Sequence, residues 1–179
     1  MATGSGCIGL ALAKAWPKAT VLLADLSEDA LELARLNTSR LGLEGQVKLL
    51  RTDLFEKVTG EFDLIVANLP YIPSAEIAGL SVEVRRDPAM ALDGGGSGLV
   101  IVERFLKEAP AHLRPSSRIA LEVGHDQGHR TAALCREAGF ATAEVRADLC
   151  GVERFVFASG STPPVSVASS PISDLPSPA

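Results

Sequence analysis

The sequence is poor in aromatic residues and cysteines and has no long apolar run. Its 179 residues include three cysteines and only eight aromatic side chains. Three cysteines without a Cys-x-x-Cys pair argue against a disulfide framework or a zinc cage, and they suit a reducing compartment. No apolar segment approaches the ~20 residues of a membrane-spanning helix. We therefore expect a cytoplasmic protein with no membrane partner and no metal site.

Positive charge is also scarce. Lys and Arg number 17 against 22 Asp and Glu, which gives a formal net charge of −5. Proteins that bind nucleic acid need clustered Lys and Arg to meet the phosphate backbone. The composition therefore argues against a nucleic-acid partner.

Composition divides the chain into one domain and a tail. Residues 159–179 hold five of the 11 prolines and seven serines, with almost no large apolar side chain. Such a segment cannot bury enough surface to offset the entropy lost on ordering, so we expect a disordered Pro/Ser-rich tail. Residues 1–158 form the predicted domain.

Within residues 1–158, short apolar runs alternate with stretches of helical periodicity. This order is typical of β-α-β units and predicts a doubly wound, Rossmann-like α/β fold, mostly parallel, with a closing strand pair. Expected strands are 21–24, 47–50, 62–67, 118–123, 143–146 and 152–158; expected helices are 7–15, 28–40 after an N-cap at Ser27, 99–112, and 126–138 before a C-cap at Gly139.

The first strand of such a sheet is largely missing. A doubly wound fold begins with a strand that leads into the first glycine loop, and here the loop begins at residue 3. A gap in mid-sheet would deprive both neighbouring strands of ladder partners. We therefore expect the domain to be incomplete at its N-terminus, either as a fragment or through a start codon placed too late.

A glycine-rich motif opens the chain. Gly4 to Gly9 reads Gly-Ser-Gly-Cys-Ile-Gly, and Asp25 follows Gly6 by 19 residues at the end of the next predicted strand. Glycines let the backbone approach a ligand, while an acidic side chain accepts hydrogen bonds from ribose hydroxyls. The pattern predicts nucleotide or nucleoside binding and leaves a dinucleotide and S-adenosylmethionine both open.

The tetrapeptide Asn68-Leu69-Pro70-Tyr71 follows the strand predicted at 62–67. Open α/β sheets place their ligands at this edge. An Asn before a proline-rigidified turn can offer a side-chain oxygen and a main-chain carbonyl to one planar NH2 group. The alternative is a plain turn beside a core tyrosine. Because the glycine loop, Asp25 and Asp53 all end strands at the same edge, we favour the NH2 site.

Six blocks occur in the order typical of one enzyme family. The chain resembles the protein-(glutamine-N5) methyltransferases of the HemK/PrmC family, which modify peptide chain release factors; the resemblance covers residues 1 to about 158. It implies an S-adenosylmethionine-dependent methyltransferase fold and a release factor as protein partner. The blocks are residues 3–8, 53–55, 62–66, 68–73, 91–95 and 121–124.

The resemblance also implies roles for individual residues. Thr3, Gly4, Ser5 and Gly6 would wrap the methionine part of S-adenosyl-L-methionine, with Ala2 where the family usually has another glycine. Asp25 would hold the ribose, and Asp53 with Leu54 would flank the adenine. Asn68 and the carbonyl of Leu69 would bind the substrate amide in a slot shaped by Pro70 and Tyr71.

Two departures keep alternatives open. The family usually has Asn-Pro-Pro-Tyr, whereas Leu69 gives a form also seen in ribosomal RNA adenine dimethyltransferases. N6-adenine methylation of RNA or DNA is therefore the second hypothesis, which the acidic charge and the block at 91–95 oppose. The family's N-terminal helical domain is also missing from the chain, so a third hypothesis is an inactive truncated remnant.

Overall fold

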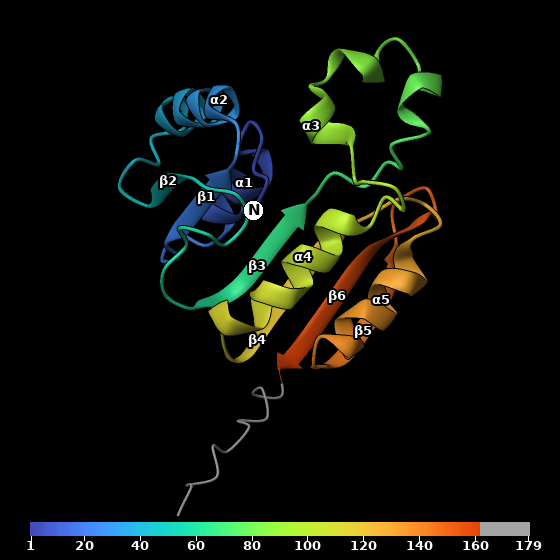
Figure 1. Cartoon of the computed structure of the whole chain (residues 1–179). Coiled ribbons are helices and arrows are strands. Elements are labelled where there is room, and N and C mark those ends of the chain that lie inside the picture. Colours follow the sequence, from blue (N-terminus) through green and yellow to red (C-terminus); the bar gives the residue numbers. More distant parts are fainter. Residues whose placement is uncertain (162–179) are drawn as a thin grey trace, which may run out of the picture.

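The computed structural model describes residues 1–161, which form an α/β fold with two sheets (Figure 1). In the first sheet β1 pairs in parallel with β2, and the second has the order β3-β4-β6-β5. β3 and β4 are parallel, while β6 runs antiparallel to both β4 and β5. The predicted α/β fold with a closing antiparallel strand is confirmed. The strands are β1 (Val21–Asp25), β2 (Val47–Arg51), β3 (Phe62–Asn68), β4 (Leu113–Glu122), β5 (Phe140–Ala147) and β6 (Glu153–Ser161).

Helices connect and cover the strands. α1 and α2 pack on the first sheet, and α5 packs on β5 and β6. Figure 1 shows the segment with η1, η2 and α3 beyond the carboxyl end of β3. The helices are α1 (Cys7–Ala15), α2 (Glu28–Arg40), α3 (Ala89–Leu92), α4 (Val100–Glu108) and α5 (Gly128–Glu137), with 3-10 turns η1 (Ile77–Gly79), η2 (Val84–Arg86) and η3 (Ala109–His112).

Local signals explain where two helices begin and end. The Ser27 hydroxyl accepts a hydrogen bond from the Ala30 amide at 3.2 Å, which caps α2 as predicted. Gly139 follows α5 with φ 94°, a left-handed conformation that favours glycine at a helix end. The helix predicted at 99–112 instead becomes 3-10 from Ala109, where Pro110 stands in its first turn.

β4 begins five residues earlier than the sequence pattern predicts. Leu113 already pairs with Phe62, and the register shifts between Phe62 and Leu64. Ser116 has φ 67°, and the Ser117 hydroxyl donates to the Phe62 carbonyl at 2.8 Å. Because of this irregularity, apolar and polar residues do not alternate regularly at the start of the strand, so the sequence pattern does not show where it begins.

The apolar core consists of two clusters. The larger cluster surrounds the fully buried Phe105, Ile119 and Val156, and a smaller one contains Leu10 and Leu23. Burial of this kind stabilises a fold by about 25 cal/mol per Å² of apolar surface. The larger cluster also reaches the first sheet, because Leu22 of β1 and Leu50 of β2 pack against it.

The two sheets are separated where a central strand is expected. Only residues 1–3 enter the space between β1 and β3: the Thr3 amide donates to the Ala24 carbonyl at 3.0 Å, and the Met1 amino group donates to the Val66 carbonyl at 2.9 Å. Among residues 1–161 no strand lies between β1 and β3. The mid-sheet gap that we considered unfavourable is present in the structure (Figure 1).

The C-terminal boundary differs slightly from the predicted one. β6 continues to Ser161, three residues beyond the predicted domain end at 158, and pairs there with Phe140. The rest of the predicted tail, 162–179, lies outside the described residues. No helix among residues 1–161 has the length and apolarity to cross a membrane.

Candidate active site

The glycine loop directly precedes α1 and lies beside the end of β1. Ala2, Gly4 and Gly6 have φ values of 47°, 54° and 82°, all in the left-handed region. A Cβ at Gly4 would meet nothing within 4 Å, whereas a Cβ at Gly9 would lie 2.3 Å from Leu23 Cδ2. Gly4 therefore leaves open space beside the backbone, as a ligand-binding loop needs, while Gly9 allows α1 to pack closely on β1.

Asp25 ends β1 and holds this loop in place. Its Oδ2 accepts a hydrogen bond from the Gly4 amide at 2.8 Å, and its Oδ1 accepts one from the Ser27 amide at 3.0 Å. Each carboxylate oxygen keeps capacity for a further hydrogen bond. Asn37 of α2 adds a second restraint, because its Nδ2 donates to the Ser5 carbonyl at 3.0 Å.

Asp53 and Leu54 follow β2 in a tight turn. Leu54 is buried with φ 43°, and its carbonyl accepts from the buried Thr52 hydroxyl at 3.1 Å. Asp53 forms a half-exposed ion pair at 3.0 Å with Arg104 of α4. Asp53 and Leu54, predicted to flank the adenine, thus lie at a strand end, and Arg104 is the partner of Asp53.

Asn68, Leu69, Pro70 and Tyr71 lie where β3 ends. Asn68 pairs with Glu122 in the strand register and exposes its side chain, whereas Leu69 is buried. Burial and nearby Glu122 raise the pKa of Tyr71, which Arg154 partly offsets. The phenol therefore stays protonated at neutral pH, and the tetrapeptide offers an exposed amide on a rigid turn.

A second segment braces this turn. Ile72 forms an isolated parallel bridge with Asp93, whose Oδ1 accepts from the Ser74 hydroxyl at 2.6 Å and from the Gly95 amide at 2.9 Å. A Cβ at Gly94 would lie 2.8 Å from the Pro70 carbonyl oxygen. The block at 91–95 therefore packs directly behind the tetrapeptide, and its glycines permit that approach.

Gln127, which the sequence analysis missed, connects the tetrapeptide to the loop after β4. Its Nε2 donates to the Tyr71 carbonyl at 2.8 Å, and its Oε1 accepts from the Gly124 amide at 2.9 Å. Gln127 is only 8% exposed, although its side chain is polar. Its position three residues after Gly124, in the block at 121–124, is the one signal that the sequence offers.

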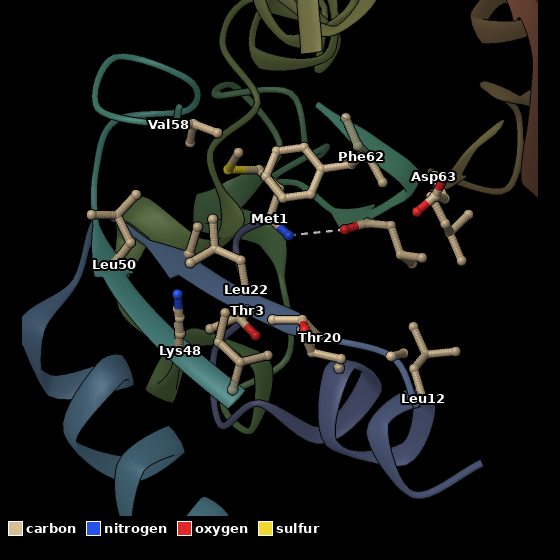
Figure 2. A pocket seen from close by; sticks show the side chains of 18 of the residues that line it. Met1, Thr3, Leu12, Thr20, Leu22, Lys48, Leu50, Val58, Phe62 and Asp63 are labelled. Carbon is tan, nitrogen blue, oxygen red and sulfur yellow. Dashed lines mark hydrogen bonds between the residues drawn. The ribbon is translucent and has the colours of Figure 1, made fainter. Parts of the chain in front are cut away.

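The predicted residues do not all meet in one cavity. A cleft of about 960 Å³ is lined by Ala2, Thr3 and Asn68 but not by Asp25, Asp53 or Tyr71 (Figure 2). Asp25 is instead the last residue of β1, and Asp53 and Tyr71 follow the carboxyl ends of β2 and β3. Among residues 1–161 no group of three or more His, Cys, Asp or Glu residues is placed to hold a metal ion.

Comparison with known proteins identifies the family of this chain. The methyltransferase small domain family matches residues 1–118, which include the glycine loop and the Asn68–Tyr71 turn. The chain belongs to the methyltransferase small domain family. Membership confirms the methyltransferase fold predicted from the sequence blocks.

Curated relatives of this methyltransferase small domain carry glutamine methyltransferase names. The chain is 45% identical over 159 residues to the release factor glutamine methyltransferase of Gloeobacter violaceus. This match covers 87% of this chain and 56% of the relative. It is 41% identical over 135 residues to the ribosomal protein uL3 glutamine methyltransferase of Bordetella pertussis, covering 75% and 45%. These matches confirm the resemblance to the HemK/PrmC family. The chain spans about half the length of these relatives.

Solved structures agree on the fold. A methyltransferase from Pyrococcus furiosus has a TM-score of 0.64 at 20% identity, covering 88% of this chain and 71% of that one. TrmN from Thermus thermophilus has a TM-score of 0.58 at 26% identity, covering 89% and 42%. The described domain is therefore built as a methyltransferase domain despite its divided sheet.

Proposed function

We propose that the chain transfers a methyl group from S-adenosyl-L-methionine to the side-chain amide nitrogen of a glutamine in a protein, with a peptide chain release factor as the first candidate. The observation that carries the proposal is the braced tetrapeptide at the end of β3, which exposes Asn68 on a turn fixed by Gln127 and by the segment at 91–95. Family membership and the relatives' names support the cofactor and the glutamine substrate.

The glycine loop fits a nucleoside ligand. The space beside Gly4 is open, and Asp25 fixes the loop while retaining acceptor capacity for ribose hydroxyls. Asp53, which pairs with Arg104, would flank the adenine together with Leu54. S-adenosylmethionine would supply a methyl group on a positively charged sulfur that leaves readily.

The tetrapeptide would prepare a poor nucleophile. An amide nitrogen reacts slowly because its lone pair is delocalised into the carbonyl. Asn68 Oδ1 and the Leu69 carbonyl would accept hydrogen bonds from the two N–H groups of the substrate, orient the NH2 group and increase electron density on nitrogen. Transfer would form an N–C bond as the S–C bond of the cofactor breaks, and the methylated nitrogen would lose one proton to water.

A second protein substrate has its own support. Several relatives are named ribosomal protein uL3 glutamine methyltransferases, and one is 42% identical over 125 residues. The slot recognises an amide, so the substrate protein would be selected by surfaces outside it. Ribosomal protein uL3 is therefore the alternative substrate.

Two measurements test the proposal. Calorimetric titration of the full chain with S-adenosylhomocysteine tests cofactor binding, and incubation with methyl-labelled S-adenosylmethionine and each candidate protein tests transfer. We expect one added methyl group on a glutamine, located by peptide mass spectrometry. Binding without transfer to either protein would contradict the substrate assignment, and absence of binding would contradict the cofactor assignment.

A further inference from the structure

The outward face of α2 carries two exposed leucines. The helix packs on β1 and β2, and its buried residues are Leu31, Ala34 and Thr38. On the other side of the helix, Leu33 and Leu36 expose 45% and 53% of their surface. Figure 1 shows α2 at the margin of the molecule. The outer face of such a helix is normally polar, so two neighbouring exposed leucines mark a surface that a partner can cover.

One charged residue stands at each end of this leucine pair. Asp29, Leu33, Leu36 and Arg40 follow one another at intervals of four, three and four residues, the spacing of the contact seam of a coiled coil. All four side chains are exposed. Within residues 1–161 neither Asp29 nor Arg40 forms an ion pair. These four residues, the α2 stripe, therefore begin with an unpaired negative charge and end with an unpaired positive one.

The α2 stripe is complementary to itself in one orientation. Leu33 and Leu36 lie equally far from its midpoint, and so do Asp29 and Arg40. A two-fold axis through the midpoint makes two copies of α2 antiparallel, so Asp29 faces Arg40 of the other copy and Leu33 faces its Leu36. A parallel arrangement instead brings Asp29 against Asp29. The charge order therefore selects a second copy of the same helix, in the antiparallel orientation.

We propose that a second copy of this chain docks on the α2 stripe, so that the two α2 helices pack antiparallel about a two-fold axis. The leucines supply the apolar contact, and the ion pairs at the ends fix the register. Leu26, just before the N-cap, and Leu41, just after the helix, are 46% and 44% exposed and extend the apolar surface at both ends.

The size of this contact makes the dimer weak and reversible. One pair of short helices buries less than the roughly 1,200 Å² at which stable interfaces begin. Exposed ion pairs add little affinity, although like charges in the same places oppose association. We therefore expect a dissociation constant in the micromolar to millimolar range. No residue of the candidate active site belongs to the α2 stripe, so the proposal goes beyond the proposed function.

Charge reversal and charge exchange test the dimer. Sedimentation velocity of the full chain between about 10 µM and about 1 mM should show conversion from monomer to dimer. Asp29→Arg and Arg40→Asp should each raise the Kd of the dimer at least about tenfold, because like charges then meet at both ends. The double variant should return to within about threefold of the unmodified chain, since the same pairs form with exchanged signs. A chain that stays monomeric throughout, or a double variant as weak as the single ones, would overturn the proposal.

Arg35→Asp is the matched control. It makes the same change of charge on the same helix at an exposed position, but five residues from Arg40 and hence on a different side of α2. Its Kd should stay within about twofold of the unmodified chain. Equal weakening by Arg35→Asp and Arg40→Asp would show that net charge, not the α2 stripe, governs association, and the proposal would fail.

A measurement on the unmodified chain completes the test, because both reversals place charge unfavourably at the ends of α2. Amide spectra recorded by NMR at low and high protein concentration should differ mainly within residues 26–41. Changes confined to other surfaces would contradict docking on α2. None of these readouts depends on methyl transfer, so they remain decisive whatever the substrate of the enzyme.

Discussion

Gln127 holds Tyr71 by its backbone: the Nε2 atom donates to the Tyr71 carbonyl at 2.8 Å while Oε1 accepts from the Gly124 amide at 2.9 Å. One side chain thereby joins the turn after β3 to the loop after β4. Gly98 permits the arrangement, because a Cβ there would lie 2.4 Å from the Tyr71 oxygen and 2.6 Å from Gln127 Nε2. The orientation of the tetrapeptide therefore depends on residues far from it in sequence.

The substitution Gln127→Glu tests this connection. It keeps the shape of the side chain but replaces the donor to Tyr71 with a carboxylate oxygen, so the turn should shift. We expect kcat to fall by roughly ten- to a hundredfold with cofactor affinity nearly unchanged. Gln46→Glu is the matched control, since Gln46 donates to the Ala13 and Trp16 carbonyls outside the site. That control should lower stability without lowering kcat; an equal loss of kcat in both variants would argue against a positioning role.

Asn68→Ala separates substrate binding from cofactor binding. Removal of the side-chain oxygen should reduce methyl transfer by at least about a hundredfold and leave the Kd for S-adenosylhomocysteine within about twofold. Asn37→Ala should instead weaken binding of S-adenosylhomocysteine and leave methyl transfer largely intact, because Asn37 Nδ2 restrains the glycine loop through the Ser5 carbonyl. Calorimetry and a single-turnover transfer assay on both variants make the comparison. Retained transfer in Asn68→Ala would refute the amide slot.

Ala2→Gly should stabilise the domain. Ala2 has φ 47°, which costs a residue with a Cβ about 1–2 kcal/mol relative to glycine. Chemical denaturation should show a higher free energy of unfolding by about 1 kcal/mol. Ala11→Gly, in the exposed middle of α1, should have the opposite effect, a loss of about 1 kcal/mol. Destabilisation by both changes would show that the left-handed backbone at Ala2 is not retained in solution.

Stability should rise with pH between about 6 and 8. Burial lowers the pKa of the Met1 amino group from 8.0 to about 6, and the charge of Asp25 only partly opposes this. In that range the unfolded chain binds more protons than the folded chain, so protonation favours unfolding. The effect approaches roughly 3 kcal/mol below pH 6. Acetylation of Met1 removes the titrating group, so the acetylated chain should be more stable at pH 6, and the two forms should converge above pH 8; parallel stability profiles would contradict this.

Much of the fold was predictable because its signals are local. The Ser27 cap, the left-handed Gly139 and the apolar runs of β1 to β3 depend on neighbours within a few residues. The start of β4 was not predictable, because a bulge opposite Phe62 interrupts the regular alternation. The helix at 99–112 was predicted too long because Pro110 changes its last turn to 3-10.

The sequence by itself determined the order of β1 to β6 and of α1, α2, α4 and α5 but not α3, together with the glycine loop and the strand-end placement of Asp25, Asp53 and Asn68. These signals are local, since hydrophobic periodicity and turn chemistry act over short distances. Only the tertiary structure decided that Gln127 holds Tyr71, that Arg104 pairs with Asp53, and that the sheet opens into a cleft beside Met1. The two side-chain contacts join residues 51 or more positions apart in the sequence, so they form only when whole strands and helices pack. That packing depends on the shape of both surfaces, which no short window of sequence contains.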